Sequence, residues 1–249
     1  MKTTSHYRFT LVEMLAVIMI LAVLFAMLMP SLQRARDRAQ GVVCTGNMRQ
    51  LAVAHTTYTR DFDFDLPGSD TGKRDADWVA GGDSPTAIED GTLYEYTQEL
   101  GVYRCPKDFR WVKFKDSDPA HLDYFWRAYS INLYLNGIKD KEPGIVRKWT
   151  KVKKSFDQVF VFVEEQDPRG YNINSFYVSR PTASLSTWSN ADWMAPLHLQ
   201  GYNLTFLDGH VEYIKIMDLY SLAASKAQGM DVPDSNVDRQ KLWSYHLPE

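Results

Sequence analysis

A membrane-length apolar run near the N-terminus constrains this chain more than any other feature. Residues 11–29 are apolar at every position except Glu13, and about 20 apolar residues cross the hydrocarbon core of a bilayer. Lys2, His6 and Arg8 precede the run without any acidic residue, which predicts a cytoplasmic N-terminus. The run is longer than the core of a secretory signal and no small-residue cleavage site follows it. We therefore expect it to stay in the protein as an anchor.

Glu13 is the unusual residue of this run. A bare carboxylate in hydrocarbon costs about 2.5–3.5 kcal/mol or more, so such groups usually have a partner or reach water. One interpretation places Glu13 near the interface, where its side chain reaches the aqueous phase. The other gives it a positive partner, and a free α-amine created by cleavage just upstream would serve.

The N-terminal residues carry a resemblance to a known family. Phe9-Thr10-Leu11-Val12-Glu13, followed by the apolar run and Pro30, resembles the prepilin motif of type IV pilins and type II secretion pseudopilins. The resemblance implies that residues 1–8 are a leader, that a prepilin peptidase cuts between Arg8 and Phe9, and that the new amine is methylated. It also implies that Glu13 pairs with the N-terminal amine of a neighbouring subunit during assembly. The family has Gly before the cut, where this chain has Arg8.

Residues 31–60 predict an amphipathic helix that continues the anchor, residues 9–30. Apolar residues recur at helical spacing between Arg and Gln side chains, which predicts one face packed on a domain. Pro30 is expected to kink the helix rather than end it, and the whole helix would be roughly 75 Å long. The alternative is an anchor followed by a separate amphipathic helix. The expected buried stripe is Leu32, Ala35, Ala39, Val42, Leu51, Ala54 and Tyr58.

Residues 61–249 are expected to form an extracytoplasmic globular domain, with an extension of unknown role at 217–249. Residues 61–90 lack periodicity and predict a loop. Asp61, Asp63 and Asp65 alternate like calcium ligands, but the Gly and Glu of an EF-hand are missing, so calcium is the weaker interpretation and we expect no cofactor. Strands are predicted at 158–164 and 175–179. One long helix followed by strands predicts an α+β fold with an antiparallel sheet, and the resemblance implies a pilin-like one.

The clearest pairing signal is HLQGYNLTFLDGHVEYIKI, residues 198–216. If Asp208-Gly209 is a two-residue turn, Phe206 faces Val211 and Leu204 faces Tyr213. Farther from the turn this register no longer pairs apolar residues with each other, because Tyr202 would face Lys215. A bulge, or a sheet covered on both faces, would account for this. His198, nine residues and Asp208-Gly209 also resemble the H-X9-DG motif of a group of bacterial prepilin-like proteins, a motif without a role to transfer.

Several residues invite a functional interpretation. For His198, Asp208 and His210 we favour structural hydrogen bonds over a metal or glycan contact, because Asp in a turn commonly bonds its own backbone. Outside the cytoplasm Cys44 and Cys105 are expected to form a disulfide, the alternative being two unpaired thiols. The candidates for exposed aromatic rings that stack on a sugar are Trp78, Trp188 and Trp193, although core packing is the commoner use.

Composition bounds the function. A net charge of −3 and a sequence pI near 6.1 argue against a nucleic-acid partner, and the sequence shows no Ser-His-Asp set, phosphate loop or metalloprotease helix. The prepilin resemblance implies a non-enzymatic subunit of an extracytoplasmic filament or of a type II secretion-type system, held by one span in a bacterial inner membrane with its domain outside. Its expected partners are homologous subunits and a prepilin peptidase. The competing hypothesis is an uncleaved, membrane-anchored module that binds a ligand such as a glycan.

Overall fold

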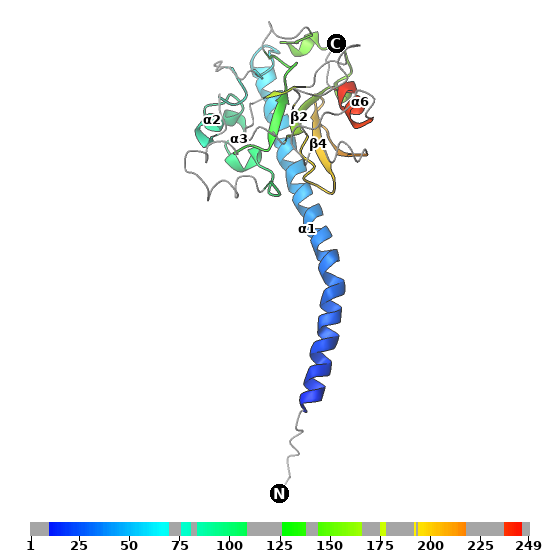
Figure 1. The fold of residues 1–249 in the computed structure, drawn as a ribbon. Coiled ribbons are helices and arrows are strands. Elements are labelled where there is room, and N and C mark those ends of the chain that lie inside the picture. Colours follow the sequence, from blue (N-terminus) through cyan, green and yellow to red (C-terminus); the bar gives the residue numbers. More distant parts are fainter. Residues whose placement is uncertain are drawn as a thin grey trace. The chain divides into compact units, whose positions relative to one another are not determined.

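The computed structural model (Figure 1) describes residues 10–69, 76–80, 84–108, 126–137, 144–165, 175–177, 192, 194–217 and 237–245. The chain forms two compact units, Met1–Ala39 and Gln40–Glu249. One helix, α1, contributes to both units. The elements are α1 (Leu11–Asp61), α2 (Pro85–Glu89), α3 (Tyr94–Thr97), η1 (Leu100–Tyr103), β1 (Tyr129–Asn132), η3 (Trp149–Lys151), η4 (Phe156–Gln158), β2 (Phe160–Glu164), β3 (Ser175–Phe176), β4 (Gly201–Phe206), β5 (Val211–Lys215) and α6 (Val237–Ser244).

A capping box begins α1. The backbone N–H and hydroxyl of Thr10 donate to Glu13 Oε2 at 2.8 and 2.7 Å, and the Glu13 N–H donates back to the Thr10 hydroxyl at 3.3 Å. Thr followed three residues later by Glu is the sequence pattern of this cap. The helix then continues through Pro30 for 51 residues. The prediction of one helix rather than two is confirmed.

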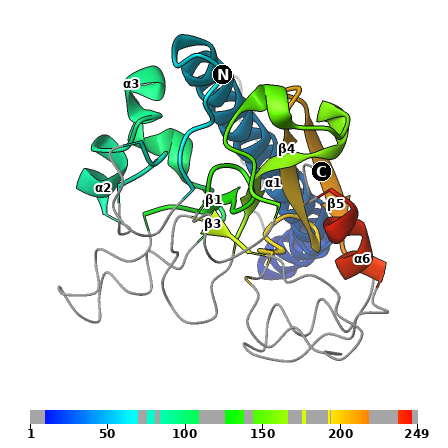
Figure 2. The ribbon, with the colours of Figure 1, turned by 90° about the horizontal axis from the view of Figure 1, so that it is seen from above.

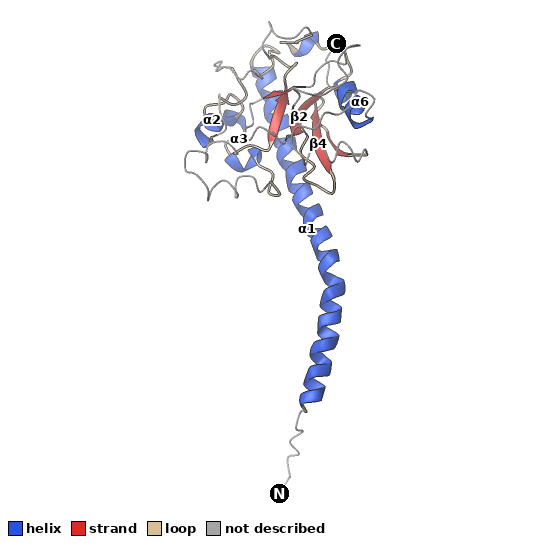
Figure 3. Cartoon of the chain, viewed as in Figure 1, coloured by secondary structure: helices blue, strands red, loops and turns tan. Residues whose placement is uncertain are grey.

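Five strands form one sheet in the order β3-β1-β2-β4-β5, and they lie together beside α1 (Figures 2 and 3). The expected α+β class is confirmed, but the sheet is mixed. β1 with β2, β2 with β4 and β4 with β5 are antiparallel, whereas β3 runs parallel to β1. The prediction of a purely antiparallel sheet was wrong because β3 pairs with β1, which lies more than 40 residues earlier in the chain. A connection of that length can return in either direction.

The hairpin of β4 and β5 differs by one residue from the predicted register. Thr205 pairs with Val211, and Tyr202 pairs with Ile214. The Phe206 N–H donates to the His210 carbonyl, and the Phe206 carbonyl accepts from the Gly209 N–H, both at 2.9 Å. The loop therefore has three residues and ends at Gly209, whose φ is +90°. A third loop residue in the left-handed region is the common alternative to a two-residue turn, and it moves every partner by one.

The sheet is covered on both faces. This is one of the two alternatives that the sequence left open for the hairpin, the other being a bulge. One core cluster unites buried residues of α1 with Ile131, Phe162 and Leu207, and a second holds Phe160, Tyr202 and other side chains of the opposite face. A register shift in β2 between Phe160 and Phe162 explains how two residues only two apart join different clusters. Such a bulge turns the rest of a strand over.

The buried face of α1 comprises Cys44, Met48, Leu51, Ala52, Ala54, His55, Tyr58 and Thr59. The predicted stripe is therefore correct from Leu51 onward. Leu32 and Val42, by contrast, are 70% and 71% exposed, so the earlier half of the stripe was wrong. The buried face of α1 instead begins with Cys44 and Met48. Burial therefore starts later along the helix than the apolar pattern predicts.

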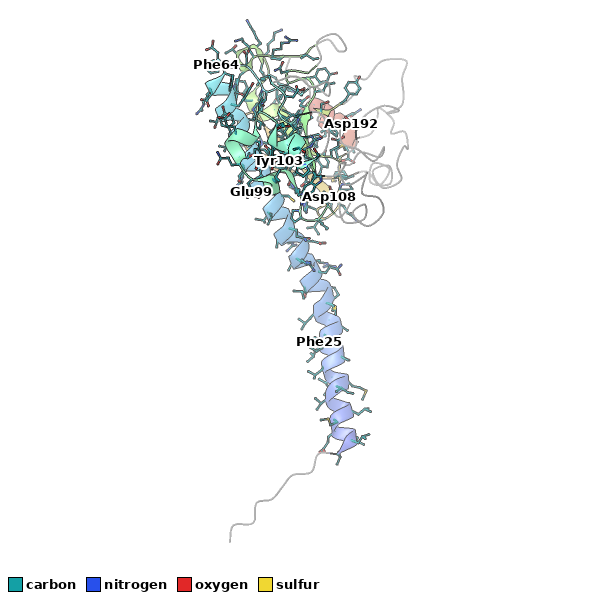
Figure 4. All side chains as sticks on the ribbon, turned by 90° about the vertical axis from the view of Figure 1, so that its left-hand side faces the viewer. Phe25, Phe64, Glu99, Tyr103, Asp108 and Asp192 are labelled. Carbon is teal, nitrogen blue, oxygen red and sulfur yellow. The ribbon has the colours of Figure 1, made fainter. Side chains whose placement is uncertain are left out.

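The apolar half of α1 shows no buried side chain. The most apolar 18-residue window of the helix is 0% buried, and α1 is long and apolar enough to cross a membrane. Phe25, labelled in Figure 4, belongs to this segment and is 61% exposed. A signal sequence passes the same test of length and composition.

A segment expected to be a loop and the extension of unknown role both contain helices. Residues 61–90 include α2, which Ser84 caps by accepting from the Ala87 N–H at 3.0 Å. The C-terminal extension includes α6, whose Leu242 is fully buried in the second core cluster. Part of the extension is therefore integral to the domain.

The core also holds an ionisable group, His55. The centroid of its ring lies 6.1 Å from that of Phe162 and 6.2 Å from that of Trp149, and among the described residues its Nε2 has no hydrogen-bond partner. Burial lowers the pKa of His55 from 6.5 to about 3. The folded protein therefore requires the neutral imidazole.

We expect this histidine to make the fold sensitive to acid. Because its pKa is lower in the folded state than in the unfolded state, its contribution is complete above pH 6.5 and is lost as the pH falls toward 3, at about 1.4 kcal/mol per pH unit. Urea denaturation of the full chain in detergent at several pH values measures this slope. His55→Leu should flatten it, whereas the exposed His210→Leu should not, and equal slopes in both variants would refute the assignment.

Candidate functional site

Four chemically active side chains meet in the interior beside α1. The Cys44 thiol donates to the Cys105 sulfur at 2.8 Å, and the Cys105 sulfur lies 3.2 Å from His198 Nε2. The same Nε2 lies 3.3 Å from Glu164 Oε1. All four ligand-type atoms lie within 4.8 Å of one another. We call these residues the Cys-Glu-His cluster. Each of the four is at most 3% exposed.

The two cysteines are brought together by a side chain one turn along the helix. Asn47 Nδ2 donates to the carbonyls of Gly101 and Arg104, at 3.2 and 2.8 Å. These contacts hold the end of η1 against α1 and place Cys105 opposite Cys44. The Tyr129 hydroxyl also donates to the Arg104 carbonyl, at 3.1 Å.

Glu164 reaches the cluster because it ends β2 on the face that α1 covers. The bulge earlier in the strand decides which face that is. The backbone N–H of Asn203 donates to Glu164 Oε2 at 2.9 Å, and its side-chain amide donates to Oε1 at 3.1 Å. A buried carboxylate is costly unless hydrogen-bonded, and these two donors from β4 both stabilise it and fix its orientation.

His198 enters from the segment just before β4. Its backbone exchanges two hydrogen bonds with Gly201 across Leu199 and Gln200, whose φ values are 47° and 66°. The Tyr213 hydroxyl donates to the His198 carbonyl at 2.9 Å. This tight bend aims the imidazole inward, where an atom added to Gly41 as a Cβ would lie 3.5 Å from the ring.

Electrostatics favour a charged imidazole in this site. Burial alone lowers the pKa of His198, but the contacts with Cys105 and Glu164 outweigh it and raise the pKa to about 9. Burial, with the contact to Cys44, raises the pKa of the Cys105 thiol well above its usual range. The His198 imidazole, in contact with Glu164, and the Cys105 thiol beside it therefore both favour their protonated forms.

The two sulfurs are close but unbonded. Cys44 and Cys105 are free thiols in this structure, and 2.8 Å is longer than the roughly 2.05 Å of a disulfide bond. The structure thus brings together the pair that the sequence singled out. The disulfide itself stays a prediction.

The predicted motif residues do not share one site. His198 belongs to the cluster, whereas Asp208 and Gly209 form the turn at the other end of β4. Asp208 Oδ1 accepts from the His210 backbone N–H at 3.1 Å and contacts the His210 ring at 2.6 Å, which is the local bonding expected of a turn aspartate. His210 stacks on Phe206 with the ring centroids 4.2 Å apart. The nine residues between His198 and Asp208 therefore include the whole of β4, with one motif residue on each side of the strand.

The structure places the remaining candidates as follows. Trp78 is fully buried, so it packs in the core, which was the favoured use of the aromatic rings, and it is no longer a candidate for an exposed sugar-stacking ring. Its segment is covered because the Trp78 N–H donates to the Gly68 carbonyl at 2.9 Å, and the ring lies 5.2 Å from that of Phe162. Trp188, Trp193, Arg8 and Phe9 lie outside the described residues.

Two of the three acidic residues, Asp61 at the end of α1 and Asp65 after it, make side-chain contacts within the domain. Asp61 accepts from the Tyr96 hydroxyl at 3.0 Å, and Asp65 pairs with Lys148 at 3.2 Å. Asp63 has a left-handed backbone, with φ of 55°. These contacts give the calcium interpretation no support.

Sequence analysis missed Glu164 and Asn203 as members of the site. The only signal for Glu164 was an acidic residue directly after the apolar stretch VFVFV, where a solvated strand end is the usual interpretation.

Comparison of the chain with known protein families, with curated proteins and with solved structures finds no match.

Proposed function

We propose that this chain is a pilin-like or pseudopilin-like subunit, held in a membrane by its N-terminal helix before it assembles into an extracytoplasmic filament. The observation that carries the proposal is α1 itself. One uninterrupted helix has an exposed apolar segment near its start and a buried face from Cys44 onward. The apolar segment needs a non-aqueous environment, and either lipid or the helices of neighbouring subunits would supply it.

Glu13 is the proposed assembly residue. In a filament it would pair with the N-terminal amine of the next subunit, which peptidase cleavage before Phe9 would create. Such a contact joins two different surfaces, and contacts of that kind propagate into a helical filament. Within one chain the carboxylate already caps α1 through Thr10. A test must therefore separate the charge from the cap.

We expect both Glu13→Leu and Glu13→Gln to abolish assembly in the native host. Gln preserves the capping box but removes the charge, and breaking one side of a desolvated ion pair costs about 3–5 kcal/mol, or more than a hundredfold in association. The measurement is the ratio of sheared filament to membrane-bound chain, by immunoblot. Thr10→Ala is the matched control, because it weakens the cap and leaves the charge.

Either of two results would contradict the proposal. Assembly by Glu13→Gln with failure of Glu13→Leu would reduce Glu13 to a helix cap. The N-terminal helix would be a plain anchor if the wild type formed no filament and its full-length chain stayed in the membrane. The amount of membrane-bound chain would then be the same in every variant. Intact mass distinguishes the cases further, because the assembled subunit should begin at N-methylated Phe9.

A membrane-anchored binding module is the second candidate, and one observation favours it. A cavity of about 450 Å³ opens near the end of α1. Tyr58 and Phe62 line it, with their ring centroids 4.4 Å apart and stacked. Arg147, Glu95 and Asn136 add polar groups, and aromatic walls with a few polar groups are typical of small-ligand sites. The plain-anchor outcome of the Glu13 test would make this function the leading one.

A further inference from the structure

We propose that the Cys-Glu-His cluster is a structural site for a zinc-class divalent metal ion. This inference is independent of filament assembly. The site joins four segments that are distant in the sequence, namely α1, the residues after η1, the end of β2 and the bend before β4. Thiolate sulfur, imidazole nitrogen and carboxylate oxygen are the three ligand types that proteins offer to zinc.

Two of the six separations between ligand atoms are close to those of a tetrahedral site, and all six lie within 4.8 Å. Zinc bonds of about 2.0–2.3 Å place neighbouring ligand atoms roughly 3.3–3.8 Å apart. The Cys105 sulfur and Glu164 oxygen lie 3.2 and 3.3 Å from His198 Nε2. The sulfurs, at 2.8 Å, must separate by about 1 Å, a small side-chain rotation, to take up thiolate–zinc geometry.

The surroundings of Glu164 resemble the outer shell of a metal centre, whereas Nδ1 of His198 has no hydrogen-bond partner among the described residues. Asn203 holds both oxygens of Glu164, and orientation of a ligand by a second layer of donors is characteristic of metal sites. The ion would enter as both thiols and the imidazole release their protons to solvent, which leaves two thiolates, a neutral imidazole and a carboxylate as ligands. Four protein ligands leave no position for a substrate, so the site is structural rather than catalytic.

The alternative use of the same sulfurs is a disulfide, and the two uses exclude each other. Bond formation would remove two electrons and two protons from the thiols and withdraw two of the four ligands. A disulfide alone would also leave unexplained why a carboxylate held by two donors and an imidazole lie beside the two sulfurs. The experiment must therefore measure metal and thiols in the same sample.

The test uses the full chain purified in detergent from its native membrane, without chelator or reductant. We expect one zinc per chain by elemental analysis and two thiols that react only after denaturation and metal removal. Replacement of zinc by cobalt should give the visible bands of tetrahedral Co²⁺ and a thiolate-to-cobalt charge-transfer band. A zinc-free chain two hydrogens lighter than the same chain after reduction would show a disulfide and overturn the proposal.

Variants identify the ligands. Cys105→Ser, His198→Gln and Glu164→Gln should each weaken zinc binding at least tenfold in competition with a chromophoric chelator, while near-ultraviolet circular dichroism reports whether each variant is folded. His210→Gln is the matched control, since that histidine is exposed and contacts Asp208 at the turn. The assignment would be overturned if any one of the three cluster variants, in its reduced form, still bound zinc as tightly as the wild type. It would also be overturned if the folded, reduced wild type bound no zinc.

Discussion

Replacing Phe162 by Ala is expected to lower the free energy of unfolding by about 3–5 kcal/mol, the usual cost of deleting a buried ring. Phe162 is fully buried on the face of β2 that meets α1. Its ring centroid lies 5.2 Å from that of Trp78 and 6.1 Å from that of His55. Removal of the ring leaves a cavity in the core cluster where α1, β2 and the segment of Trp78 meet.

Denaturation of the full chain in detergent, followed by tryptophan fluorescence, measures this loss. Phe64→Ala is the matched control, because the same side chain at that position is 49% exposed and exposed substitutions usually change stability by less than about 0.5 kcal/mol. A similar loss in the two variants, or a loss below about 1 kcal/mol for Phe162→Ala, would show that α1 does not pack on this face of the sheet.

Replacing Gly201 by Ala is expected to destabilise the domain by about 3 kcal/mol, at the upper end of the range for overpacking. A Cβ at Gly201 would lie 2.4 Å from the Ile214 carbonyl oxygen and 2.5 Å from the ring of Tyr213. The carbonyl belongs to the neighbouring strand β5, so it can move only if the hairpin separates. That movement would also disturb the bend that aims His198 into the cluster.

Gly46→Ala provides a control of opposite sign. Gly46 lies within α1 and has nothing within 4 Å of an added Cβ. Gly costs about 1 kcal/mol relative to Ala in a helix interior, so this variant should be more stable by up to that amount. Urea midpoints of both variants give the comparison. Equal shifts in the same direction would contradict the described packing of β4 on β5.

Features with a local physical cause could be predicted from the sequence. The continuous helix follows from its apolar run and the periodicity after Pro30. The strand in residues 158–164 follows from a short, β-branched and aromatic stretch, and the turn at Asp208 from its dipeptide. Even there, the hairpin register was wrong by one residue, because two-residue and three-residue loops share the same Asp-Gly signal and only the packing of Tyr202 opposite Ile214 decides between them.

The candidate site was predictable only in part. Cys44, Cys105 and His198 attracted attention as reactive residue types, but nothing in their spacing connects them. Glu164 and Asn203 looked like ordinary strand residues. Their meeting depends on a bulge in β2, on the bend before β4 and on Asn47 holding the end of η1. The bulge and the Asn47 contacts involve segments far apart in the chain, and the local bend before β4 is held by the hydroxyl of Tyr213 on the next strand.

The sequence by itself thus determined the long helix with its apolar segment, the α+β class and the turn at Asp208. Hydrophobic periodicity, capping and turn residues act over a few positions, so a linear pattern records them. Only the tertiary structure decided the parallel edge strand, the hairpin register, the burial of Trp78 and the assembly of the Cys-Glu-His cluster. These depend on which surfaces pack together, and a single residue's shift along a strand exchanges its buried and exposed faces.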